Sequence, residues 1–393
     1  MRRGKGDDLL EKIQQTKKCT LLGVGPMSRN CVDAALELSA ESVAPLMLIA
    51  SRRQIDAASF GGGYVNSWHT AAFADYVRAR TPASKVLLAR DHGGPWQNPV
   101  EIRERCDAAR ALASAQESFL EDIRAGFDLL HIDTSLALDD VAPRAEAIDR
   151  FFHLLEFCHR ETLKKGRKLL YEMGTESQSG LTADHHELNR DLEEILSRCD
   201  RENLPRPTFV VVQTGTKVAE RRNVGTFDSP IRVAGELPAE IQVPLVLEVC
   251  RRHRILLKEH NADYLSDEAL QWHPRLGIHA ANVAPEFGVV ESEALVELLE
   301  SQGLADLADK FTAMAVDSGM WKKWLLPESR ANERDKTLLA GHYVMGRPEF
   351  QELKRHASQK LGSRGIDLDV VLREKIKQAI RRYMVHFRLV EEA

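Results

Sequence analysis

The segment KVLLARDHGGP, residues 85–95, decides the fold. Its apolar run leads directly into Asp91 and His92, and two glycines follow. An apolar run without strict polar alternation is typical of a parallel strand that is buried on both faces. Similar runs recur along the chain and predict eight strands: Cys19–Gly25, Pro45–Ala50, Lys85–Arg90, Leu129–Ile132, Lys168–Met173, Thr208–Gln213, Ile255–Glu259 and Leu276–Ala281.

Segments of helical period lie between these strands. Examples are Ser28–Leu38, Pro99–Phe127, which begins with a proline suited to a first helical turn, and Val141–Lys165, which carries an apolar stripe. A strand followed by a helix, repeated eight times, predicts a (β/α)8 TIM barrel. A doubly wound open sheet is the alternative. Its glycine-rich fingerprint is incomplete here, because Gly23–Pro26 lacks the third glycine.

The pattern of the chain changes after about Pro327. Residues 328–336 are polar and charged, and residues 366–387 form a long, amphipathic and basic helical pattern. We therefore expect a barrel over residues 1–326 and a C-terminal helical appendage over residues 327–393. The appendage is expected to pack on the barrel or on another subunit.

The composition is that of an ordinary soluble globular protein: 393 residues, 43% hydrophobic and 29% charged, with a formal charge of −5. This charge argues against a surface that grips nucleic acid, and no run approaches the roughly 18 apolar residues of a membrane span. The six cysteines include no CxxC pair, so they are interpreted as buried thiols and not as zinc ligands. We expect a cytoplasmic protein without membrane or nucleic-acid partners.

Polar groups at the strand ends predict where chemistry takes place, because the active site of a TIM barrel lies at the C-terminal ends of its strands. His92, Glu176 and His260 follow the third, fifth and seventh predicted strands. Three such ligands around an open position would make a catalytic site for Zn²⁺, or for Mn²⁺ or Co²⁺. Asp91 could move a proton on a substrate hydroxyl, and Asp133 could position that hydroxyl or orient a ligand histidine.

Each of these histidines also has a plainer interpretation. A single histidine at a strand end is more often a hydrogen-bonded structural group than a metal ligand, so the metal hypothesis depends on the three ligands occurring together. The pair His185–His186 lies in a polar helical start and is expected to be solvated.

Further polar residues near the strand ends are candidates for substrate binding: Arg52, Gln54, Gly62, Gln213, Asp263 and Asn282. Arg52 or its neighbour Arg53 could meet an anionic substrate, or could pair with carboxylates of the barrel. The glycines at 61–63 could cradle a phosphate through backbone N–H groups, or could form a flexible loop.

The ordered set of strand-end motifs resembles the D-tagatose-bisphosphate aldolase subunit family known as GatZ/KbaZ. The motifs are Ala50–Asp56 with the glycines at 61–63, Asp91–Pro95, His131–Asp133, Gly174–Glu176, Val210–Gln213 and Glu259–Tyr264. That family is similar to the zinc-dependent class II sugar-phosphate aldolases, which are (β/α)8 barrels. The resemblance implies an acid/base role for Asp91 and metal-binding roles for His92, Glu176 and His260.

The resemblance leaves the activity open. Family members have been regarded as non-catalytic partners of a separate aldolase subunit, whereas some relatives are described as ketose 4-epimerases. Glu176 departs from the histidine of the catalytic aldolases. Gly94, Trp96 and the segment Asn282–Phe287 depart from the family pattern, which favours a different sugar or a sugar monophosphate over the usual bisphosphate.

The sequence therefore favours a metal-dependent class II aldolase-like enzyme that acts on a ketose or ketose phosphate, including by 4-epimerisation. The alternative is a non-catalytic tagatose-bisphosphate aldolase subunit that stabilises a partner aldolase. A metal-dependent sugar isomerase is a third option. Expected partners are a small sugar or sugar phosphate, a partner aldolase subunit under the second hypothesis, and further copies of the chain in a homo-oligomer.

Overall fold

Eight parallel strands close into a barrel in the computed structural model, which describes residues 19–174, 181–228 and 238–391. The order around the barrel is β1-β10-β9-β6-β5-β4-β3-β2, and β1 pairs with both β2 and β10. The strands are β1 Leu21–Val24, β2 Leu46–Ser51, β3 Val86–Gly93, β4 Leu129–Asp133, β5 Leu170–Gly174, β6 Phe209–Val211, β9 Leu256–Glu259 and β10 Ala280–Val283. Every predicted strand overlaps one of these, so the (β/α)8 TIM barrel is confirmed.

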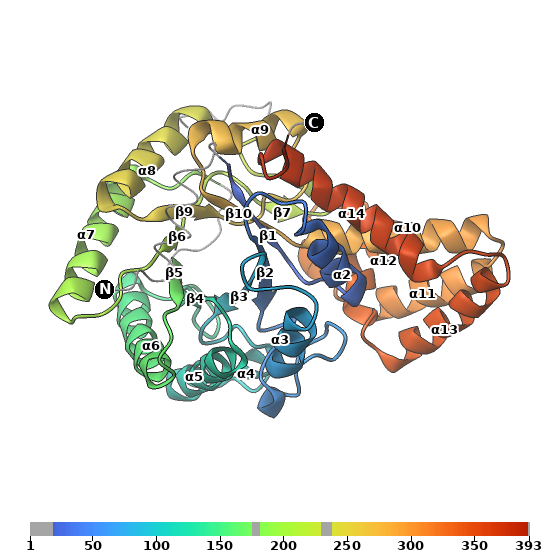
Figure 1. The fold of residues 1–393 in the computed structure, drawn as a ribbon, viewed down its shortest axis with the longest axis horizontal. Coiled ribbons are helices and arrows are strands. Elements are labelled where there is room, and N and C mark those ends of the chain that lie inside the picture. The colour runs from blue at the N-terminus through green and yellow to red at the C-terminus, as the bar shows by residue number, and fades with distance from the viewer. Residues whose placement is uncertain (1–18, 175–180, 229–237, 392–393) are drawn as a thin grey trace.

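Helices cover the outside of the barrel between successive strands (Figure 1). They are α2 Arg29–Leu38, α3 Thr70–Arg78, α4 Pro99–Arg103, α5 Ala108–Ala125, α6 Arg144–Lys164, α7 His185–Arg201, α8 Ala239–His253 and α9 Asp267–Leu276; a short helix, η1 Ala58–Phe60, follows β2. The predicted helix Pro99–Phe127 is divided in two. Arg105 has a positive φ of 49°, and Asp107 begins α5 by accepting a hydrogen bond from the Arg110 N–H.

A small hairpin, β7 Val218–Ala219 and β8 Arg222–Asn223, follows β6. Beyond β10 the chain continues through α10 Pro285–Ser301, α11 Ala305–Asp317, η2 Lys322–Trp324, α12 Glu333–Val344, α13 Pro348–Gly362 and α14 Leu368–His386. Helices α10 to α13 and the first turns of α14 pack around a second apolar cluster beside the barrel (Figure 1). The fold thus carries a helical layer on one side.

Helix α14 returns from this layer to the barrel wall. It packs against α9, β1 and α2, which is the place between the last and first barrel helices (Figure 1). The Thr20 N–H donates to the Phe387 carbonyl at 3.1 Å, and the Val43 N–H donates to the Leu389 carbonyl at 2.9 Å. The sequence assigns α14 to the appendage, but in its packing α14 takes the position of the eighth outer helix. The division at residue 326 remains a prediction.

All six cysteines are buried thiols. No helix in the described ranges combines the length and the apolar character that crossing a membrane requires.

Ile380 on α14 should be essential to barrel stability. Its side chain is fully buried in the main core, so Ile380→Ala should lower the free energy of unfolding by about 2–5 kcal/mol. Val385 lies on the same helix but is 52% exposed, so Val385→Ala should change it by no more than about 0.5 kcal/mol. Urea unfolding followed by circular dichroism measures both. Equal effects of the two changes would show that α14 does not close the barrel wall.

Candidate active site

The end of β3 carries a β-bulge. The register between β3 and β4 shifts between Arg90 and Gly93, and His92 has a positive φ of 44°. A bulge re-aims side chains that a regular strand would send to opposite faces. Asp91 and His92 consequently line the same cavity at the C-terminal end of the barrel.

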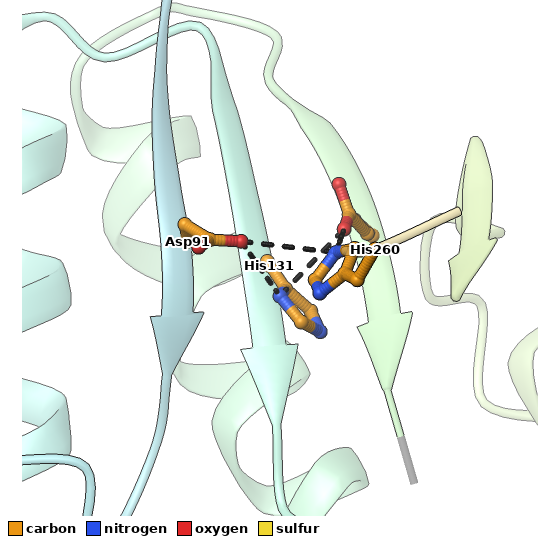
Figure 2. A group of neighbouring side chains, drawn as sticks. Asp91, His131 and His260 are labelled. Carbon is orange, nitrogen blue, oxygen red and sulfur yellow. Dashed lines mark hydrogen bonds and ion pairs between the residues drawn. The ribbon is translucent and has the colours of Figure 1, made fainter. Parts of the chain in front are cut away.

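Four titratable side chains meet beside this cavity, and three of them, Asp91, His131 and His260, line it. Asp91 on β3, His131 on β4, Glu172 on β5 and His260 just after β9 each place one nitrogen or oxygen within 4.8 Å of the other three. Figure 2 shows Asp91, His131 and His260 of this group pointing toward one another. Asp91 Oδ1 lies 3.7 Å from both His131 Nδ1 and His260 Nε2. Glu172 Oε1 lies 3.6 Å from His131 Nδ1 and 3.2 Å from His260 Nε2. We call these four residues the donor cluster.

Lys258 forms an ion pair with Glu172 of the donor cluster. Its Nζ lies 2.6 Å from Glu172 Oε2, and both side chains are fully buried. Burial raises the pKa of Glu172, but the charge of Lys258 and the two nearby imidazoles outweigh it and lower the pKa to about 2. Glu172 is therefore an ionised carboxylate although no water reaches it.

Asp91 and His260 are also in ligand-competent states. Burial opposes the charge of Asp91, but the neighbouring His92, His131 and His260 lower its pKa below the ordinary range. Burial lowers the pKa of His260 more than Asp91 and Glu172 raise it. The cluster thus presents ionised carboxylates and, at His260, a neutral imidazole, which are the forms that bind metal ions.

This donor set fits a divalent metal. Imidazole nitrogens and carboxylate oxygens suit Zn²⁺, Mn²⁺ and Co²⁺. His131 Nδ1 accepts a hydrogen bond from the His92 backbone N–H at 3.2 Å, so a metal bound at Nδ1 would replace that contact. His131 Nε2 is buried and has no hydrogen-bond partner in the described part of the chain.

Gly174 makes room for the His131 ring. A Cβ at position 174 would lie 2.4 Å from His131 Nε2, which is closer than real Cβ atoms approach. Gly174 ends β5, next to the strand that carries His131. The glycine at this strand end therefore sets the position of the imidazole.

His92 lies beside the donor cluster and pairs with Asp133. Its Nδ1 is 2.6 Å from Asp133 Oδ2, and its Nε2 is 3.9 Å from Asp91 Oδ2. Gln97 Nε2 donates to Asp133 Oδ2 at 2.8 Å, and the Ser135 hydroxyl donates to Asp133 Oδ1 at 2.6 Å. Burial opposes the charge of His92, but Asp91 and Asp133 raise its pKa to about 9. The metal-ligand role predicted for His92 remains a prediction, since its ring lies outside the group of four.

The cavity has a volume of about 490 Å³. Eight residues singled out in the sequence line it: Gln54, Asp91, His92, Asp133, Gln213, His260, Asp263 and Asn282. Asn282 Nδ2 donates to Asp91 Oδ1 at 3.2 Å. Asp263 Oδ1 accepts from the Ala284 and Glu286 N–H groups at 3.0 and 2.9 Å, so it holds the first turn of α10. Burial and the neighbouring Glu286 raise the pKa of Asp263 to about 7.

Two other sequence candidates, Arg52 and Gly62, do not line the cavity, and a third cannot be placed among the described residues. Arg52 does not line the cavity: its buried guanidinium bonds Asp56 at 2.9 Å and Glu101 at 2.6 Å. This is the alternative in which one arginine pairs with barrel carboxylates, and Arg53 is the one that lines the cavity. Gly62 has a φ of +75° and is also not among the lining residues. Glu176 falls outside the described residues.

Sequence reasoning missed His131 and Glu172 as site residues. Both lie inside strands, where β4 reads LLHID and β5 reads LYEMG. A lone carboxylate in an apolar strand is a usable signal, because an unpaired buried charge is costly and needs a partner. Lys258 in the β9 segment LLKE is the matching signal.

A family comparison agrees with the resemblance seen in the motifs. The family described as D-tagatose-1,6-bisphosphate aldolase subunit GatZ/KbaZ-like matches residues 7–192, a little less than half of the chain. The matched range contains Asp91, His131 and Glu172, whereas His260 lies beyond it.

Solved structures share the fold at low sequence identity. A probable tagatose 6 phosphate kinase from Sinorhizobium meliloti has a TM-score of 0.72 at 18% identity, covering 93% of this chain and 100% of that one. A fructose-bisphosphate aldolase from Campylobacter jejuni has a TM-score of 0.54 at 11% identity, covering 98% and 95%. A fructuronate-tagaturonate epimerase from Cohnella laeviribosi has a TM-score of 0.54 at 12% identity, covering 95% and 82%. The differing activities in these names show that the fold by itself does not select the reaction.

Gly174→Ala should weaken metal binding because the added methyl group displaces the His131 ring. We expect the affinity for Zn²⁺ to fall by about 10–100-fold, the usual effect of disturbing a group that orients a ligand. Isothermal titration calorimetry on the metal-stripped chain measures it. Gly362→Ala is the control, since a Cβ there meets no other atom within 4 Å. Unchanged Zn²⁺ affinity in Gly174→Ala would remove His131 from the ligand set.

Proposed function

We propose that this chain is a divalent-metal-dependent, class II aldolase-like enzyme that acts on a ketose or ketose phosphate by aldol and retro-aldol chemistry. The donor cluster at the floor of the barrel cavity is the observation that carries the proposal. The match of residues 7–192 to the GatZ/KbaZ-like family supports a sugar phosphate as the class of substrate. Epimerisation at C4 belongs to the proposal, because it needs only cleavage, rotation and re-addition at one site.

The donor cluster would hold Zn²⁺, or Mn²⁺ or Co²⁺, through Asp91, His131, Glu172 and His260. The bound ion would polarise the substrate carbonyl and stabilise the enediolate. In this assignment His260 keeps its predicted role, and Asp91 serves as a ligand in place of the acid/base role predicted for it. Asn282 fixes the Asp91 carboxylate, and Lys258 keeps Glu172 ionised.

Proton transfer falls to the pair of His92 and Asp133. The 2.6 Å contact holds a proton at His92 Nδ1, and both side chains line the cavity. Gln97 and Ser135 hold Asp133 in place by direct hydrogen bonds. His92 is protonated near neutral pH because its pKa is raised to about 9, so it can give a proton to a substrate oxygen and take it back without moving the backbone.

The location and assembly of the chain belong to the same proposal. Six buried thiols suit a reducing cytoplasm. A homo-oligomer is the common state of soluble metabolic enzymes and remains a prediction.

Metal removal should abolish the activity of the chain. We expect the chelator-treated protein to be inactive toward a panel of ketoses and ketose phosphates, and Zn²⁺, Mn²⁺ or Co²⁺ to restore it. Chromatography of the products separates 4-epimers and short-chain fragments from simple isomers. His260→Ala should lose both metal and activity, whereas His153→Ala, an exposed histidine on α6, should retain both. Full activity in the chelator-treated protein or in His260→Ala would contradict the metal assignment.

Asp133→Asn should separate proton transfer from metal binding. The amide keeps the shape of the side chain but removes the negative charge that stabilises protonated His92, so kcat should fall by about 10²–10⁴-fold. Zn²⁺ affinity should stay within about threefold of the native value, because Asp133 is not in the donor cluster. Steady-state kinetics and calorimetry on the same sample measure both. A loss of Zn²⁺ with the loss of rate would place Asp133 in metal binding.

The second candidate is a non-catalytic subunit that stabilises a partner aldolase. The word subunit in the family description favours it. Co-expression with class II aldolases would then give a stable complex and raise the thermal stability of the aldolase. The metal-free chain should do this as well as the metal-loaded one. Failure to form any complex, together with intrinsic activity of the chain alone, would exclude this candidate.

A further inference from the structure

The helical layer contributes part of the lining of the cavity. Lys323 and Trp324 of η2 and Tyr343 of α12 line the cavity together with Arg53, which follows β2. The Glu220 N–H of the β7–β8 hairpin donates to the Trp324 carbonyl at 2.7 Å, so η2 is tied to the barrel loops. The segment after β10 thus supplies part of the site.

Arg53 and Lys323 have no carboxylate partner among the described residues. Lys323 Nζ lies 4.8 Å from the centres of the Trp324 and Tyr343 rings. The neighbouring Arg52 differs, since Asp56 and Glu101 neutralise it. The two adjacent arginines of this loop therefore differ. Arg52 is buried in ion pairs, whereas Arg53 lines the cavity.

The carboxylates that line the cavity already have other partners. Asp91 belongs to the donor cluster, Asp133 pairs with His92, and Asp263 holds backbone N–H groups of α10. None of them neutralises Arg53 or Lys323. The cavity thus has a donor cluster of paired charges and a rim of unpaired positive charge.

Arg53 and Lys323 line the same cavity, and the charge of Arg53 acts on Lys323. The Lys323 side chain is solvent-accessible where it lines the cavity, yet surrounding protein atoms and the charge of Arg53 lower its pKa to about 8. Holding two cations together without a counter-ion costs free energy, and a bound anion would recover it. Arginine and lysine are also the side chains that recognise phosphate and carboxylate groups most strongly.

We propose that Arg53 and Lys323 bind an anionic end group of the substrate, a phosphate or a carboxylate, while the carbonyl end of the same molecule meets the donor cluster. This inference rests on the proposed function and narrows its substrate class from a ketose or ketose phosphate to ketoses that carry a phosphate or a carboxylate group. The helical layer then has a defined task, because η2 positions one of the two cations. Neutral ketoses lack the group that Arg53 and Lys323 recognise.

Anion binding to the intact, metal-stripped chain tests the proposal apart from catalysis. The probes are inorganic phosphate and acetate, and isothermal titration calorimetry at pH 7 measures the binding of each. We expect phosphate, acetate or both to bind, and Arg53→Gln and Lys323→Gln each to weaken that binding by about tenfold or more. Lys322→Gln is the matched control: Lys322 is the exposed neighbour in η2, does not line the cavity, and should leave binding within about twofold. Binding of phosphate alone points to a sugar phosphate, and binding of acetate alone points to a sugar acid.

A conservative variant supplies a second measurement. Lys323 should lose its proton as the pH rises through about 8, so native anion binding should weaken between pH 7.5 and 9. Lys323→Arg stays charged over this range and should keep its affinity. If neither anion binds, or if Lys322→Gln loses as much affinity as Lys323→Gln, the proposal is overturned. Loss of metal binding with intact anion binding would contradict the proposed function and leave this site standing.

Discussion

The ion pair of Lys258 and Glu172 is the interaction on which the rest of the site depends. Both side chains are fully buried, 2.6 Å apart, in the interior of the barrel. Two carboxylates within a few ångströms of each other would normally take up a proton, because like charges disfavour ionisation. Lys258 and the imidazoles of the donor cluster keep Asp91 and Glu172 ionised. The barrel interior can therefore hold a set of metal ligands rather than a neutral polar patch.

The barrel itself was predictable from the sequence for a simple reason. Strands buried on both faces must be continuously apolar, so the runs ending near Arg90, Ile132 and Glu259 stand out against the amphipathic helices. Residues just beyond such runs meet at one mouth, which is why Asp91, His260 and several lining residues were found. This inference requires only that the strands be parallel and the sheet closed.

The remaining features depend on information that residue type does not carry. His131 and Glu172 are hidden inside strands that their neighbours mark as core. The bulge at His92 decides which of two adjacent residues joins the donor cluster. Arg52 and Arg53 are identical in type, and only the tertiary position of Glu101 separates a structural arginine from one that faces the cavity. Local pattern cannot resolve any of these choices.

The central claim is that Asp91, His131, Glu172 and His260 form one metal site. Anomalous diffraction at the zinc edge from crystals of the zinc-loaded chain tests it most directly. We predict a single strong peak within bonding distance of Asp91, His131, Glu172 and His260. A peak coordinated by His92 with His131 unbound, or no peak at this end of the barrel, would contradict it.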